Sequence, residues 1–190
     1  MRGIRTFISL PLPSGLAKYC NLLISELKGR GVEARWAIPE ELHITLAFMG
    51  ELKTMEVVTA CRSATKITAK TESFILGISG LGFFPSAKRP RILWAGIERG
   101  ERETRAFQKE LSDLLISERL YRTDDKPFHP HITLGRLNES IDLDAEGLLD
   151  DFRHHKSPVG RIETCLVMES IPGTDPRYAT MATCPLAKAV

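Results

Sequence analysis

Two short stretches of this 190-residue chain carry the same residues, His-Ile-Thr-Leu, so each places a hydroxyl two positions after an imidazole. The pairs are His43 with Thr45 and His131 with Thr133. Side chains two positions apart in a β-strand point to the same face, so each pair would stand side by side. Two imidazoles that titrate near neutral pH can act as acid and base, and two hydroxyls can hold phosphoryl oxygens. These residues therefore predict in-line attack on a phosphodiester, without a metal ion.

A single His-x-Thr in a strand is more often an ordinary structural feature than a catalytic one. In this chain the two copies fall at matched positions of a repeated pattern. Phe7 lies 36 residues before His43, and Ile92 lies 39 residues before His131. A repeat of this kind indicates an internal duplication, and it favours a catalytic pair of histidines over two unrelated structural ones.

Hydrophobic periodicity predicts the elements that position the two pairs. Both motifs read as strands, and helices with one apolar face connect them to strands rich in β-branched residues. The other expected strands are 6–12, 73–81, 91–97 and 161–170, and the expected helices are 14–28, 54–68, 101–119 and 144–154. This order predicts two β-α-β-α-β units, at about 1–81 and 91–190, within a single domain. The segment 81–91, LGFFPSAKRPR, is expected to be a long cationic loop between them, either solvated or facing an anion.

The composition, with 43% hydrophobic and 26% charged residues, is that of an ordinary globular protein with a sizeable core. A formal net charge of +2 is far below that of proteins that coat nucleic acid, although it allows a local basic pocket. No apolar run approaches the roughly 18 residues of a membrane span, and Pro11 and Pro13 break the N-terminal run too early for a signal peptide. We expect a soluble cytoplasmic protein.

The other reactive side chains favour structural roles. His129 and His131 form a His-x-His pair that could bind a metal, but no cysteine or acidic ligand is evident nearby, so we predict no metal site. Glu40 and Glu41 would repel a phosphate and are expected to be solvated. The cysteines have no CxxC spacing and are expected to be buried, reduced thiols. They are Cys20, Cys61, Cys165 and Cys184.

The blocks around the two motifs resemble a known family. ELHITLAFMG (41–50) and PFHPHITLGR (127–136) are similar to the signature motifs of the two-histidine phosphoesterase superfamily. More closely, they resemble those of bacterial and archaeal RNA 2′,3′-cyclic phosphodiesterases, also called 2′-5′ RNA ligases. The resemblance covers nearly the whole chain. It implies a bilobal α+β fold with mainly antiparallel sheets that line a central cleft, no cofactor, and hydrolysis of cyclic phosphate ends of RNA or nucleotides to 2′-phosphates.

The same resemblance implies a role for each residue of the motifs. His43 corresponds to the general acid that protonates the leaving 3′-oxygen, and His131 corresponds to the base that activates water. Thr45 and Thr133 correspond to the hydroxyls that hold the phosphate. Because the two units are alike, the residues alone do not distinguish the acid from the base.

Arg136 follows the second motif at a spacing where members of the family often carry a basic residue, which implies that it steadies the phosphate charge. It lies five positions after His131, so strict alternation directs it to the opposite face unless the strand bends or ends at Gly135. Phe48 stands in the same relation to His43. For Phe48, a core position and contact with a base are both open.

Arg91 and Tyr178 are further candidate substrate contacts. Arg91 comes just before a strand that contains tryptophan, and Tyr178 opens the last strand. The end of the chain, RYATMATCPL, departs from the pattern expected of the family because no proline follows the tyrosine early. This departure leaves the position of Tyr178 open.

Two other functions remain open at this point. Ligation is the reverse reaction and would use the same residues, but water at about 55 M outcompetes a hydroxyl unless the site positions a second RNA. A module that binds RNA ends or nucleotides without turnover has no need of a matched acid and base. We therefore expect a metal-independent hydrolase that acts on RNA ends or small cyclic nucleotides as a monomer.

Overall fold

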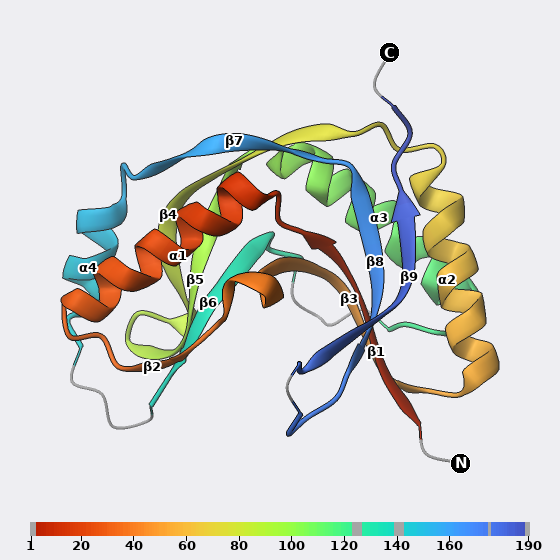
Figure 1. The fold of residues 1–190 in the computed structure, drawn as a ribbon, viewed down its shortest axis with the longest axis horizontal. Helices are drawn as coiled ribbons and strands as arrows, with labels where there is room; N and C mark the ends of the chain where they lie inside the picture. The colour runs from red at the N-terminus through yellow and green to blue at the C-terminus, as the bar shows by residue number, and fades with distance from the viewer. Residues whose placement is uncertain (1–2, 123–126, 139–142, 175, 189–190) are drawn as a thin grey trace.

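A computed structural model describes residues 3–122, 127–138, 143–174 and 176–188 (Figure 1). In these residues the chain forms four α-helices, one 3₁₀ helix (η1) and nine strands. In chain order the elements are β1 (Ile4–Pro11), α1 (Ser14–Gly29), β2 (Ala34–Trp36), η1 (Pro39–Glu41), β3 (His43–Leu52), α2 (Thr54–Thr68), β4 (Phe74–Ser86), β5 (Arg89–Arg99), α3 (Glu101–Ser117), β6 (His131–Leu137), α4 (Ala145–Phe152), β7 (Lys156–Ile162), β8 (Thr164–Ser170) and β9 (Tyr178–Pro185).

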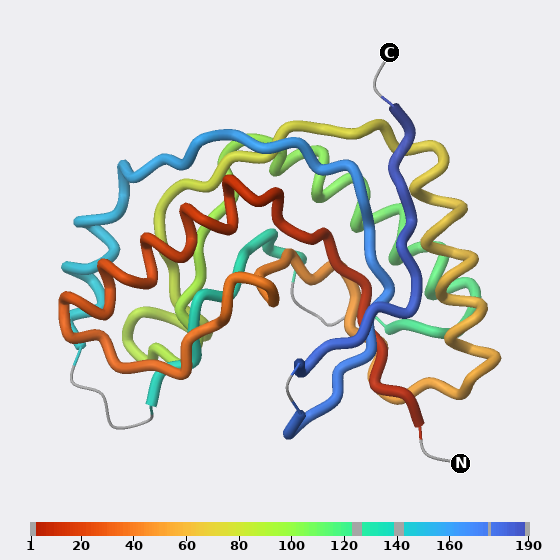
Figure 2. Tube along the Cα trace, in the orientation of Figure 1, coloured from red at the N-terminus to blue at the C-terminus, as the bar shows by residue number. Residues whose placement is uncertain are grey.

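The strands form two antiparallel sheets with the orders β3-β1-β8-β9 and β2-β6-β5-β4-β7. Helices α2 and α3 pack on the first sheet, and α1 and α4 pack on the second. Figures 1 and 2 show an arch, with α4 and α2 on its two outer flanks and α1 running beneath β7. The prediction of an α+β fold with mainly antiparallel sheets is confirmed.

The two sequence halves exchange strands. The last strand of the first half, β4, pairs with β5 of the second half, and β8 of the second half pairs with β1. The helices cross as well, because α1 packs against β7 whereas α3 packs against α2 and β3. Since neither half holds a complete sheet, we propose that the two halves fold together as one unit.

The helix predictions agree with the structure to within two residues at each end. The reason is visible in α1, where every residue expected on the apolar face is buried. These residues are Leu16, Cys20, Leu23, Ile24 and Leu27. A helical period of 3.6 residues is a local property, so it survives any arrangement of the sheets.

The prediction of a loop at 81–91 is wrong, because this segment belongs to the hairpin of β4 and β5. Phe83 pairs with Leu93, and Gly82 pairs with Trp94. Gly82 has a steric function in this hairpin. A Cβ atom at Gly82 would lie 2.1 Å from the Trp94 ring, which covers this position.

The prediction of one continuous strand at 161–170 is also wrong. Strand β7 ends at Ile162 and strand β8 begins at Thr164, and the two strands belong to different sheets. Buried residues fall at Ile162, Cys165 and Val167, so the alternation shifts phase between the first two. Leu166 and Met168 are apolar at positions that are not buried, and they hide this shift in the sequence.

The motif strands β3 and β6 are anchored by aliphatic side chains on the face opposite to their histidines. Ile44, Leu46, Ile132 and Leu134 are at most 2% exposed. Burial of each such side chain stabilises the fold by roughly 1.5–3 kcal/mol. The polar residues between them are thereby held toward the open side of the arch.

The four cysteines are unpaired, and three of them are buried, whereas Cys61 is half-buried. The prediction of free thiols is therefore confirmed. Within the described ranges, no helix has the length and apolarity needed to cross a membrane.

Candidate active site

Strands β3 and β6 each carry a bulge directly after the His-x-Thr pair. In β3, Thr45 and Ala47 pair with consecutive residues of β1, so Leu46 is an extra residue. In β6, Thr133 and Gly135 pair in the same way with consecutive residues of β5. A bulge shifts the alternation by one residue. The residue five positions after each histidine therefore returns to the face of that histidine.

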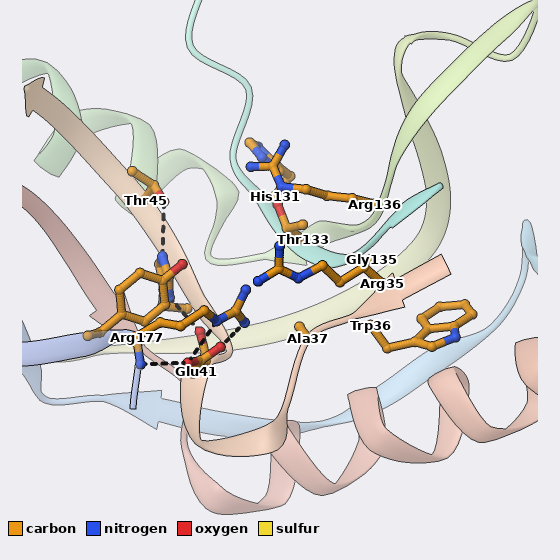
Figure 3. A pocket seen from close by; sticks show the side chains of 12 residues that line it. Arg35, Trp36, Ala37, Glu41, Thr45, His131, Thr133, Gly135, Arg136 and Arg177 are labelled. Carbon is orange, nitrogen blue, oxygen red and sulfur yellow. Dashed lines mark hydrogen bonds and ion pairs between the residues drawn. The ribbon is translucent and has the colours of Figure 1, made fainter. Parts of the chain in front are cut away.

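The two motifs meet at one pocket of about 130 Å³, which both pairs of His and Thr line. Figure 3 shows Thr45, His131 and Thr133 around it. The lining residues are Arg35, Trp36, Ala37, Glu41, His43, Thr45, His131, Thr133, Gly135, Arg136, Arg177 and Tyr178. Arg136 is among them because the bulge in β6 shifts the alternation by one residue. Its side chain therefore lies on the same face as His131, not on the opposite face that strict alternation predicts. The structure thus brings together six of the eight residues named from the sequence.

The other two candidates do not line this pocket. Phe48 occupies the position of β3 that corresponds to Arg136, but it is 46% exposed and lines a separate surface depression with Arg119 and Tyr121. The guanidinium of Arg5 stands 4.8 Å from the centre of the Phe48 ring. Arg91 is exposed on β5 and is not among the lining residues.

Both histidines are held in the same way through Nδ1. The Nδ1 of His43 lies 2.6 Å from the carbonyl oxygen of Glu41, and the Nδ1 of His131 lies 2.7 Å from that of His129. A carbonyl can only accept, so in each neutral imidazole Nδ1 carries the proton and Nε2 is left as a base. The Nε2 of His43 lies 3.1 Å from the hydroxyl of Thr45, which can donate to it.

Burial lowers the pKa of both imidazoles below the ordinary value. The smaller effects on the pKa differ between the two histidines. The Glu41 carbonyl and carboxylate favour the protonated form of His43, while a positive charge on His131 opposes it. At His131, the carbonyl of His129 favours protonation and the imidazole of His129 opposes it. Near pH 7 both rings of the free protein are therefore mainly neutral.

Aromatic rings hold both imidazoles in place. The rings of Phe7 and Tyr178 lie 5.2 and 5.5 Å from that of His43, and the Tyr178 contact is edge-on. The ring of Phe84 makes an edge-on contact with His131 at 4.9 Å. Tyr178 therefore lies at the site despite the unusual end of the chain. These contacts restrict the orientations that each histidine can take.

Glu41 is not solvated, contrary to the expectation from the sequence. Its side chain is only 7% exposed and forms an ion pair with Arg177, whose Nε donates to one carboxylate oxygen at 3.1 Å and whose terminal nitrogen donates to the other. The pair ties η1 to the start of β9, next to Tyr178. Because the carbonyl of Glu41 also accepts from His43, the ion pair fixes the segment that orients this histidine.

Glu41, Arg177 and Arg35 are the lining residues with charged side chains that the sequence interpretation did not select. Glu41 and Arg177 are separated by 136 positions, so no local pattern links them. The position of Arg177 directly before Tyr178 is the one hint in the sequence. Arg35 reaches the pocket because β2 pairs with β6, a contact between the two halves of the chain.

The donor set of the pocket suits an anion. It contains three arginines and one carboxylate, so its fixed charges sum to +2 when both histidines are neutral. In the portion of the chain that the structure describes, no three His, Cys, Asp or Glu side chains gather into a group that could hold a metal ion. A phosphate group can be bound here by arginines and hydroxyls alone.

The chain is similar to known phosphoesterases over most of its length. The LigT like Phosphoesterase family model matches residues 10–94. An RNA 2′,3′-cyclic phosphodiesterase of Aquifex aeolicus is 26% identical over 153 residues, or 80% of this chain and 81% of that protein. One of Thermotoga maritima is 26% identical over 95% of both chains. The crystal structure of TT0787 of Thermus thermophilus superposes over the full length of both chains with a TM-score of 0.78 and 22% identity. This chain therefore belongs to the LigT-like phosphoesterases, the family of the RNA 2′,3′-cyclic phosphodiesterases.

Proposed function

We propose that this protein hydrolyses the 2′,3′-cyclic phosphate ends of RNA or of nucleotides and releases a 2′-phosphate. The observation that carries the proposal is the pair of imidazoles that line one pocket, each with Nδ1 on a carbonyl and Nε2 available for proton transfer. An acid and a base on opposite sides of phosphorus suit in-line displacement. The similarity to RNA 2′,3′-cyclic phosphodiesterases supports the same substrate class.

In the proposed reaction, His131 takes a proton from water as the water oxygen bonds to phosphorus. The bond between phosphorus and the 3′-oxygen breaks, and that oxygen receives the proton carried by Nε2 of His43. Thr45 and Thr133 donate hydrogen bonds to the non-bridging oxygens, and Arg136 offsets their negative charge. After this step His131 is protonated and His43 is neutral. His131 then releases its proton to water and His43 takes one up, which restores the starting state for the next turnover.

The charges next to the two histidines support this assignment of roles. The Glu41 carboxylate, which favours protonated His43, is the one acidic group among the lining residues of the pocket. The imidazole of His129, in contrast, favours neutral His131. The acid is therefore assigned to His43 and the base to His131.

We also propose that the protein works as a monomer in the cytoplasm, where its unpaired cysteines stay reduced.

The test is to identify the product. Purified protein in EDTA should convert uridine 2′,3′-cyclic phosphate into uridine 2′-phosphate, separated from the 3′-isomer by chromatography. Formation of the 3′-isomer would contradict the assignment of the 3′-oxygen as leaving group. A 2′-5′-linked product in the presence of an RNA 5′-hydroxyl, with no 2′-phosphate, would show a ligase instead. Binding without turnover would show a non-catalytic module.

The pH dependence of kcat/KM should have its maximum on the acidic side of about 6.5, the ordinary pKa of histidine. The reaction needs one protonated and one neutral imidazole, and burial lowers the pKa of both in the free protein. When the pH rises above these pKa values, His43 loses the proton that it must donate. When the pH falls below them, His131 gains a proton and no longer acts as a base, so kcat/KM decreases on both sides. The negative substrate raises both pKa values, so the maximum of kcat should lie at higher pH. A kcat/KM that rises steadily through neutral pH would contradict this.

A further inference from the structure

Two arginines stand directly opposite each other at one edge of the pocket. Arg35 of β2 and Arg136 of β6 are paired in register, and both side chains extend into the pocket (Figure 3). Like charges at directly opposed positions of an antiparallel pair destabilise it. Among the residues that the structure describes, no carboxylate forms an ion pair with either guanidinium. This arrangement favours a bound anion that both arginines can share.

The charge in the pocket exceeds what a cyclic phosphate needs. Glu41 and Arg177 neutralise each other, which leaves the charges of Arg35 and Arg136. A 2′,3′-cyclic phosphate is a diester and carries one negative charge. With both histidines neutral, one positive charge therefore remains for a second anionic group, and the proton that His43 carries in the proposed reaction adds to it.

This positive charge lies on one side of an otherwise symmetric site. Strands β3, β1 and β8 of one sheet correspond to β6, β5 and β4 of the other, but β2 is an additional edge strand beside β6. At the position of β3 that corresponds to Arg136, the chain carries Phe48. An RNA strand that ends in the pocket would leave it in one direction only, and the arginines favour the side of β2.

We propose that Arg35 binds the phosphodiester directly upstream of the nucleotide that carries the cyclic phosphate. Arg136 lies on the same strand as His131, and the bulge in β6 returns it to the face of that histidine, so we assign it to the reacting phosphate. Arg35 comes from β2, the edge strand whose backbone lies about 4.8 Å beyond that of β6, and its side chain reaches into the pocket from that edge (Figure 3). The preferred substrate is therefore an oligonucleotide end, which contains this upstream diester, over a cyclic mononucleotide, which lacks it. This inference rests on the proposed function, since it extends the same site by one nucleotide.

A second explanation for the excess charge is stabilisation of the reacting phosphate itself, which gains negative charge in the transition state. The two explanations differ in the substrates that they affect. An arginine that serves the reacting phosphate helps every substrate equally. An arginine that serves the upstream diester helps only a substrate in which that diester is charged.

The test therefore compares two dinucleotides that differ in one charge. Both are UpU with a 2′,3′-cyclic phosphate end, and in one of them a methylphosphonate replaces the linking phosphodiester, which makes this link neutral. The ratio of kcat/KM for the charged over the neutral dinucleotide measures recognition of the upstream charge. In Arg35→Gln this ratio should fall about tenfold, the size expected for one lost hydrogen-bonded charge pair.

Salt and control variants make the result specific. Loss of one phosphate contact should also reduce the slope of log kcat/KM against log salt by about 0.7 for the charged dinucleotide. Arg35→Lys should retain part of the ratio. Arg62→Gln, an exposed arginine on α2 outside the pocket, removes the same net charge and should leave the ratio unchanged.

A ratio that stays at the wild-type value in Arg35→Gln overturns the inference, whether or not turnover of both dinucleotides falls. Such a result leaves the proposed function intact, because both dinucleotides are still hydrolysed by the wild type. If the wild-type protein hydrolyses neither dinucleotide nor uridine 2′,3′-cyclic phosphate, the proposed function itself is wrong.

Discussion

Replacement of His43 or His131 by alanine should each lower kcat for uridine 2′,3′-cyclic phosphate by about 10²–10⁴-fold, the usual contribution of one general acid or base. In the proposed reaction each histidine transfers a proton through its Nε2 atom, and no other imidazole among the described residues lines the pocket. The acid and the base act in one step. The kcat of the double variant should therefore decrease by a much smaller factor than the product of the two factors for the single variants. Steady-state kinetics on the three variants measures this.

The thermal midpoint of each variant and its affinity for uridine 2′-phosphate are the controls for misfolding. A variant that stays folded and binds product, yet retains wild-type kcat, would show that its histidine is not catalytic.

A substrate with sulfur in place of the 3′-oxygen separates the two roles. Thiolate leaves without protonation, so this substrate should restore turnover to His43→Ala but not to His131→Ala. Restoration of His131→Ala alone would reverse the assignment.

Glu41→Gln should lower kcat by about 10–10²-fold, since a small displacement of a catalytic group can have an effect of this size. The carboxylate is buried against Arg177, and its backbone carbonyl accepts from Nδ1 of His43. Loss of the ion pair should also reduce the free energy of unfolding by about 1–2 kcal/mol, because Arg177 is only partly exposed. The catalytic loss should therefore accompany a modest loss of stability.

The pH profile distinguishes a positioning role from a purely structural one. The Glu41 carboxylate raises the pKa of His43, against the larger effect of burial. Without it the pKa falls further, so the basic limb of kcat/KM should move to lower pH. A variant that is only less stable would keep the limb in place.

The matched control for Glu41→Gln is Glu40→Gln, because Glu40 is exposed and has no hydrogen bond in the described part of the chain. Arg177→Met should reproduce the loss of activity, and the double variant should be no worse than either single one. Equal activity in Glu41→Gln and Glu40→Gln would show that the ion pair does not position His43.

The sequence predicts the elements whose pattern is local. Helix α2 begins and ends as predicted, at Thr54 and Thr68. Each His-x-Thr pair faces one side of its strand because alternation needs only the strand itself. The errors at 81–91 and 161–170 have a different origin. Gly82 depends on a ring from the opposite strand, and the break at Glu163 depends on which sheet receives each segment.

The residues of the site also separate into those that a local pattern predicts and those that depend on distant segments. The types and spacing of His43, Thr45, His131 and Thr133 are present in the sequence, and alternation alone predicts that each histidine shares a face with its threonine. The position of Arg136 depends on a bulge, and a bulge depends on the register with the neighbouring strand. The burial of Glu41 against Arg177 and the pairing of Arg35 with Arg136 join distant segments. Only tertiary structure decides such contacts, because they depend on which strands become neighbours, and periodicity does not encode this.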